Sequence, residues 1–211
     1  MTNDADAPGY PRLEFYWIEP DADQKAESRW GELAGATHRL QAVVDELEAL
    51  TLSEGVAIER ALARLSYHIE NFLIRTYELR ERLVQLVGGI AGADAGGLKK
   101  PTKRTATWVK LGPSVRHFQP KVDRLLEILD SDILLRNQHT HDASLRLGLY
   151  TGSDIHEPDD VLMELKAKPE IRLAIEGVLH AEILRLAREY STKAGTTVDA
   201  TWEILDLADG R

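Results

Sequence analysis

The sequence predicts an all-α protein, an antiparallel helical bundle. The 211 residues are 43% hydrophobic but only 6% aromatic, and most of the apolar residues are Leu, Ala, Ile and Val. This composition favours helix over strand in a globular protein. Apolar residues recur at intervals of three and four along several long segments, as on one face of a helix. Neither an internal repeat nor an alternation of strands and helices is visible, so long amphipathic helices must pack on one another.

We expect one domain behind a short tail. Residues 1–12 are rich in acidic residues, Pro and Gly and are expected to be disordered, and Leu13–Ile18 is expected to form an extended arm. No long Pro- or Ser-rich linker divides residues 13–211, which favours a single helical domain. Its first helix is predicted from about Asp23 to Leu50, where apolar residues recur at helical spacing.

The clearest periodicity predicts the second helix. Its apolar positions alternate in steps of four and three: Ile58, Leu62, Leu65, Ile69, Phe72, Thr76, Leu79, Leu83 and Leu86. This heptad-like seam predicts a helix of about 35 residues, capped by Ser53 and ended by Gly88-Gly89. Its outer residues are mostly charged and fit a solvated face. As an alternative, Glu70, Asn71 and Tyr77 line a polar cleft, because buried polar atoms need partners.

The later elements follow from glycine and proline. Five glycines between residues 88 and 97 predict a flexible connector. Pro120 marks the start of a helix to Asp130, and the helix that holds residues 135–142 follows directly, ending at Gly148 and Gly152. Pro158 opens a short helix. Pro169 precedes a longer helix that stops before Gly195, and a last amphipathic segment spans 198–207.

Composition excludes several function classes. Without cysteine the chain has no disulfide, no thiolate nucleophile and no cysteine-ligated metal. No segment approaches the roughly 18 consecutive apolar residues of a membrane span, and the polar N-terminus is unlike a signal peptide, so we expect a cytoplasmic protein without membrane contact. No cofactor is expected.

Positive charge is concentrated in one segment. The net charge is −9, yet no acidic residue lies between Asp94 and Asp123, where seven basic residues give +7 and leave 19 basic against 35 acidic residues elsewhere. One interpretation is a solvated loop that balances acidic helix faces. The other is an RNA-binding segment, because its cations attract phosphate and Trp108, His117 and Phe118 could stack on bases. The residues expected to bind RNA are Lys99, Lys100, Lys103, Arg104, Trp108 and Lys110.

The stretch from Leu135 to Asp142 has the residue types of a catalytic site. Arg136 offers a permanent charge and bidentate contact to phosphate, and His141 can move a proton near neutral pH. Asn137 lies four residues before His141 and shares its helix face, and His139 is a secondary candidate. These residues suit metal-independent RNA cleavage, in which the ribose 2′-hydroxyl attacks the adjacent phosphate. Alternatively, Arg136 pairs with an acidic neighbour and the histidines are ordinary polar residues.

The run Arg136-Asn137-Gln138-His139-Thr140-His141 resembles the Arg-(four to six residues)-His motif of the HEPN superfamily, with Asn137 directly after the arginine as in its commonest form. Residues 68–80 resemble an early helix of such bundles, and the resemblance covers about residues 25–190. It implies a four-helix core with additional helices, in a homodimer whose motifs meet in one cleft. It also implies a metal-independent endoribonuclease in which Arg136 and His141 are catalytic and Asn137 positions them.

The resemblance leaves the biological role open. Many members are toxins or defence effectors, which predicts a regulatory protein partner, whereas others have lost catalysis. The alternative is therefore a noncatalytic protein that binds RNA, nucleotides or partners, with Arg136 and His141 too far from the dimer axis for a joint site. A metal-dependent bundle is a third interpretation, suggested by His139, His141, Asp142, His156 and Glu157. It is disfavoured because His139 and His141 are two residues apart rather than four.

Overall fold

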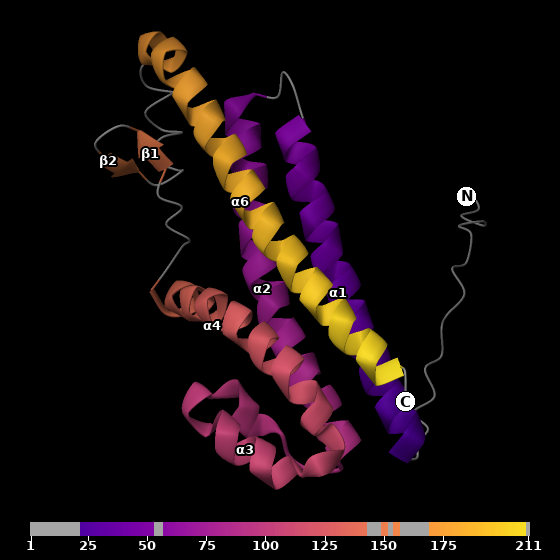
Figure 1. Ribbon diagram of the computed structural model, residues 1–211. Helices are drawn as coiled ribbons and strands as arrows, with labels where there is room; N and C mark the ends of the chain where they lie inside the picture. The colour runs from indigo at the N-terminus through magenta and orange to yellow at the C-terminus, as the bar shows by residue number, and fades with distance from the viewer. Residues whose placement is uncertain (1–21, 53–56, 143–148, 152–153, 157–168, 210–211) are drawn as a thin grey trace, which may run out of the picture.

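The computed structural model describes residues 22–52, 57–142, 149–151, 154–156 and 169–209, with side chains for 28–51, 57–134 and 176–209 (Figure 1). It has the predicted all-α fold, a bundle of helices. The long helices are α1 (Ala22–Leu52), α2 (Ile58–Ala91), α4 (Gln119–Asp142) and α6 (Pro169–Asp209). A short α3 (Arg104–Leu111) and the 3₁₀ helices η1 (Gly96–Lys99), η2 (Pro101–Lys103) and η3 (Pro113–Phe118) lie between α2 and α4.

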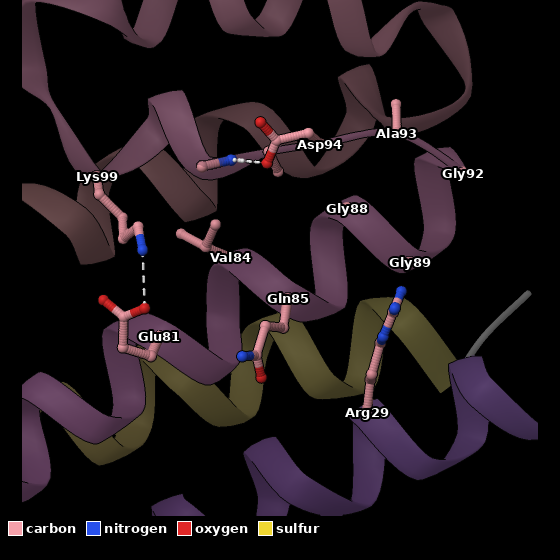
Figure 2. Close-up of a pocket in the computed structure, with 12 residues that line it drawn as sticks. Arg29, Glu81, Val84, Gln85, Gly88, Gly89, Gly92, Ala93, Asp94 and Lys99 are labelled. Atoms are coloured by element: carbon pink, nitrogen blue, oxygen red, sulfur yellow. Dashed lines mark hydrogen bonds and ion pairs between the residues drawn. The ribbon is translucent and has the colours of Figure 1, made fainter.

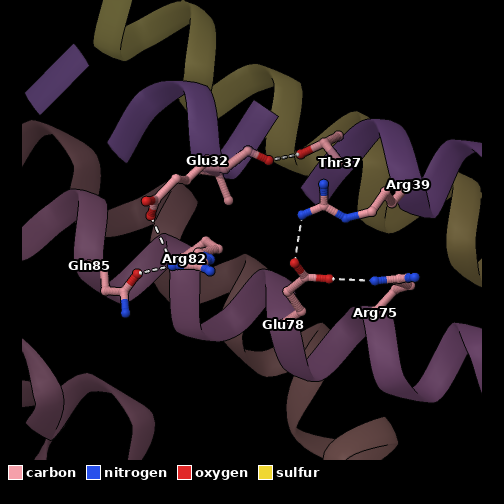
Figure 3. Close-up of polar contacts among 8 residues, drawn as sticks. Glu32, Thr37, Arg39, Arg75, Glu78, Arg82 and Gln85 are labelled. Carbon is pink, nitrogen blue, oxygen red and sulfur yellow. Dashed lines mark hydrogen bonds and ion pairs between the residues drawn. The ribbon is translucent and has the colours of Figure 1, made fainter. Parts of the chain in front are cut away.

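Helices α1 and α2 are antiparallel neighbours. Ion pairs join the start of α1 to the end of α2, with Arg82 Nη1 at 2.9 Å from Glu32 Oε2, and Arg39 Nη2 lies 2.6 Å from Glu78 Oε1 farther along (Figure 3). Arg75 donates a second hydrogen bond to Glu78, at 2.9 Å. Partial burial raises the pKa of Glu78, but the hydrogen bonds and charges of Arg39 and Arg75 outweigh it and hold that pKa below its usual value. Charged residues on the outer side of α2 therefore form ion pairs that join it to α1.

Helix α6 is antiparallel to both α1 and α4. The Trp30 indole N–H near the start of α1 donates to the Leu205 carbonyl near the end of α6, at 3.3 Å. Lys121 Nζ, at the start of α4, lies 2.8 Å from Glu203 Oε2. In Figure 1, α6 crosses in front of α2, and α4 diverges from α6 towards its own C-terminal end.

The predicted seam of α2 is the centre of the core. Its apolar members are all buried, and the Phe72 ring meets the Tyr190 ring of α6 edge-on at 5.6 Å. Each fully buried Leu, Ile or Phe side chain contributes about 1.5–3 kcal/mol. One continuous cluster of buried apolar residues runs from Leu33 in α1 to Ala208 in α6.

The prediction that α2 ends at Gly88-Gly89 is wrong, and so is the prediction that a flexible connector follows it. Gly88 and Gly89 are helical, and α2 continues to Ala91, where Gly92 adopts a left-handed conformation (φ 63°) and the Ala93 N–H donates to the Gly88 carbonyl. A Cβ on Gly88 would lie 2.8 Å from the Ala93 carbonyl oxygen, so this glycine lets the chain turn back onto the helix. The connector is a packed turn, because Ala95 and Leu98 are buried. The predicted cap, Ser53, lies outside the described residues.

Two further boundaries differ from the prediction. Helix α6 begins at Pro169 as expected but runs through Gly195 without a break, so the separate last segment is part of it. A glycine in a helix costs only about 1 kcal/mol, and burial of the flanking Ala194 and Val198 outweighs this cost. Helix α4 starts at Gln119, one residue before the predicted Pro120, and runs through Asp130 to Asp142 without a break, so the separate motif helix is part of it. The predicted end at Gly148 and Gly152 lies outside the described residues.

An antiparallel hairpin of two short strands, β1 (Leu149–Thr151) and β2 (Asp154–His156), was not predicted. In its register Leu149 is opposite His156 and Tyr150 is opposite Ile155. The expected tail (1–12), the arm (13–18) and the helix expected at Pro158 lie outside the described residues. None of the helices, over the stretches that the structure covers, combines the length and apolarity needed to cross a membrane.

Candidate functional site

The motif lies on the last two turns of α4. Its backbone is helical from Gln119 to Asp142, so Arg136 and His141 belong to one continuous helix; their side chains, and those of Asn137 and His139, are outside the described residues. Arg136 follows Asp132 by four residues, and Asp132 is buried. The motif therefore begins one helical turn after a part of α4 that packs on the bundle.

Asp132 of α4 lies near Lys193 and Tyr190 of α6. Burial raises the pKa of the Asp132 carboxyl, and the positive charge of Lys193 only partly opposes this effect. Burial also raises the pKa of Tyr190, whose ring centroid is 4.9 Å from Lys193 Nζ. The contact between α4 and α6 beside the motif thus holds a carboxyl group that favours its protonated form more than a solvated aspartate does.

The basic segment lies along α4. The Arg104 guanidinium, at the start of α3, pairs with Asp130 at 2.7 Å and donates through Nε to the Leu98 carbonyl at 2.9 Å. The Trp108 indole N–H, one turn later, donates to Asp123 at 2.8 Å. Helix α3 therefore runs antiparallel to α4, with its first residue nearest the motif. Asp130 and Arg136 are six residues apart, which is about 9 Å along the helix axis.

The seven cations of the segment divide into two sets. Lys99, Arg104 and Lys121 are in ion pairs with Glu81, Asp130 and Glu203 at 2.7–2.8 Å. The other four are exposed and have no ion pair to any described residue: Lys100, Lys103, Lys110 and Arg116. Lys103 directly precedes α3 and Lys110 is in its last turn, two helical turns away. The unpaired set forms the positive surface of the segment.

Burial corrects part of the expected RNA-binding set. Trp108 is 2% exposed and Phe118 is fully buried, so neither ring is available to stack on a base. Arg104 is 8% exposed, with its guanidinium used within the protein. Arg104 and Trp108 lie on the inner face of α3, which the helical spacing of Arg104, Trp108 and Leu111 could have indicated. His117 remains exposed, 4.1 Å from the Phe118 ring between centroids.

The residues proposed for a polar cleft on α2 differ in their exposure. Glu70 is exposed, whereas Asn71 and Tyr77 are half-buried. The Tyr77 ring lies under the Arg80 guanidinium, 5.1 Å from centroid to Cζ. None of the three lines an open pocket that lies at the C-terminal end of α2.

That pocket was not foreseen from the sequence. It is an open depression of about 590 Å³ at the C-terminal end of α2, and Figure 2 shows Arg29, Glu81, Asp94 and Lys99 at its rim, with glycines of α2 and the following turn as its wall. Lys99 pairs with Glu81, and the Asp94 carboxylate accepts the Gly96 N–H at 2.8 Å. The Arg29 guanidinium lies so close to Gly89 that a Cβ there would collide with it. Among the described residues that line the pocket, two cations thus balance two carboxylates and leave no excess charge to select an ion.

No known protein family, curated protein or solved structure matches this chain. Across the described side chains, no three His, Asp or Glu residues converge as metal ligands would. The metal-dependent interpretation concerns side chains that lie outside the described ones: those of His139, His141, Asp142, His156 and Glu157.

Proposed function

We propose that this protein is a HEPN-like, metal-independent endoribonuclease in which Arg136 and His141 are catalytic and Asn137 positions them. The observation that carries the proposal is the placement of unpaired cations beside the motif helix. The start of α3, which Lys100 and Lys103 precede in the chain, contacts α4 at Asp130, about 9 Å along the axis from Arg136. A single RNA strand bound to these lysines would extend towards the motif.

The chemistry follows from the two residue types. A histidine removes the proton of a ribose 2′-hydroxyl, the 2′-oxygen bonds to the adjacent phosphorus, and the bond from phosphorus to the 5′-oxygen breaks. The leaving 5′-oxygen takes a proton, and the products are a 2′,3′-cyclic phosphate and a 5′-hydroxyl. A guanidinium beside the phosphate stabilises the charge that builds on its oxygens in the transition state. Two copies would bring two arginines and two histidines to one cleft.

Cleavage of mixed RNAs in excess chelator tests the proposal. We expect cleavage by the purified chain, and a loss of at least about 100-fold in Arg136→Ala and in His141→Ala. Arg124→Ala is the matched control, because Arg124 is an exposed arginine of the same helix. Circular dichroism would show that the variants fold. RNAs left intact by the folded protein, or cut equally by the motif variants, would refute it.

A noncatalytic RNA-binding scaffold is the second candidate. It is favoured by the same four exposed cations, which attract a phosphate backbone without help from the motif. The two candidates differ in one measurement, because the scaffold binds RNA with unchanged affinity in Arg136→Ala and never shortens it. As a toxin or defence effector in the cytoplasm, the nuclease would in addition stop growth when expressed, unless a regulatory protein restrains it.

A further inference from the structure

Helix α2 has a second regular stripe on its outer side. Arg60, Ala63, Tyr67, Glu70 and Ile74 follow one another in steps of three and four, and all five are exposed. Tyr67 is 62% and Ile74 56% exposed, unusual values for large apolar side chains. The same spacing builds the packing seam of paired helices. The core seam of α2 is covered by α1, α4 and α6, but no described residue covers this outer one.

Two charged residues of opposite sign, Arg60 and Glu70, flank Ala63 and Tyr67 in this stripe. Arg60 and Glu70 are exposed and make no ion pair within the described part of the chain. Their neighbours on α2 behave differently, since Arg64 pairs with Glu46 of α1 and Arg75 with Glu78. Arg60 and Glu70 therefore remain available to a partner.

The order of these residues is self-complementary. In two identical antiparallel helices related by a two-fold axis, positions equally far from the axis on either side face each other. An axis at the level of Leu65 places Arg60 opposite Glu70, five residues to each side. The same axis places Ala63 opposite Tyr67, two residues to each side. This one register pairs Arg60 with Glu70 and packs the large Tyr67 ring against the small Ala63. Because of the two-fold symmetry, each of these contacts occurs twice in the dimer.

We propose that the part of this outer stripe formed by Arg60, Ala63, Tyr67 and Glu70 is a docking surface for a second copy of this chain packed antiparallel across it. Ala63 leaves room for the Tyr67 ring of the other copy, which allows close approach of the helices. The surface from Arg60 to Glu70 extends over ten residue steps, about 15 Å of helix. Because so short a contact is small among stable interfaces, we expect a reversible dimer that dissociates on dilution.

Sedimentation equilibrium over a range of concentrations, with charge exchange, tests the surface. We expect a monomer–dimer equilibrium for the wild type. Arg60→Glu and Glu70→Arg each place like charges together twice and should raise the dissociation constant at least about tenfold. The double variant restores both pairs in reverse and should return to within about threefold of the wild type. Arg188→Glu, on the exposed side of α6, is the matched control and should change nothing.

Several results would overturn the proposal. These are a wild type that is monomeric throughout, a dimer that survives the single variants, a double variant as weak as the singles, or equal weakening by Arg188→Glu. A monomer whose thermal stability falls in Tyr67→Ser would mean that a segment of the same chain covers the stripe, which also overturns it. The surface lies on α2 and includes no residue of the motif, so the outcome of the RNA-cleavage assay leaves this test unaffected.

Discussion

The division between paired and unpaired cations predicts how RNA binding depends on salt. Each phosphate neutralised on a single strand contributes about −0.7 to the slope of log affinity against log salt concentration. Lys100, Lys103, Lys110 and Arg116 are unpaired, so full engagement of these four gives a slope of about −2.8. Between 50 and 200 mM salt, the affinity should therefore fall roughly 50-fold.

Single substitutions make this prediction specific. Lys103→Ala should weaken binding of an unstructured RNA and make the slope less steep by about 0.7. Lys99→Ala is the control, because Lys99 is already paired with Glu81 at 2.8 Å and should leave the slope nearly unchanged. Fluorescence anisotropy with a labelled RNA at five salt concentrations measures both. Equal changes in the two variants, or a slope near zero in the wild type, would refute the reasoning.

Three further predictions concern stability, measured by thermal and urea denaturation. Gly97→Ala should lower the free energy of unfolding by about 1–3 kcal/mol, because its Cβ would collide with the Thr107 hydroxyl. Gly177→Ala has open space around it and should raise the free energy of unfolding by up to about 1 kcal/mol, because alanine favours a helix more than glycine does. Asp132→Asn should raise stability at pH 7, since the folded state raises the pKa of this buried carboxyl; the gain is about 1.4 kcal/mol per unit of that shift. It should vanish as the pH falls below about 4, where Asp132 is protonated in both folded and unfolded states. Gly195→Ala should stabilise the continuous helix by about 1 kcal/mol, and Gly195→Pro should cost about 3 kcal/mol or more.

Each of these predictions has a contradicting result. Equal effects of alanine at Gly97 and Gly177 would contradict the close packing of η1 on α3. A gain in Asp132→Asn that persists at low pH would mean that ionisation of the carboxyl is not its cause. Tolerance of proline at Gly195 would mean that α6 is broken there, as the sequence suggested.

The sequence predicted the helices whose burial is regular. The four-and-three pattern of α2 was decisive because each of its apolar positions, from Ile58 to Leu86, faces other helices. Three glycines were poor guides to helix ends. At Gly88, Gly89 and Gly195 the small cost of glycine in a helix is outweighed by packing on either side, which the local sequence does not reveal.

The candidate site was predictable only in part. The cluster of positive charge was visible in the sequence, but the division into paired and unpaired cations depends on acidic residues as distant as Glu203. Trp108 was assigned to RNA by residue type, although its helical spacing places it in the core. The pocket at the end of α2 had no local signal at all, because Arg29 and Gly89 come from different helices.

Cleavage of an RNA with a single 2′-deoxy substitution tests the central claim most directly. A short RNA that is cut at one site is compared, in excess chelator, with the same RNA carrying 2′-deoxyribose on the 5′ side of that site. The proposal predicts a 2′,3′-cyclic phosphate on the cut RNA, no cleavage of the substituted bond, and no cleavage of either RNA by Arg136→Ala. Cleavage of the substituted bond, or activity that requires a divalent metal, would contradict it.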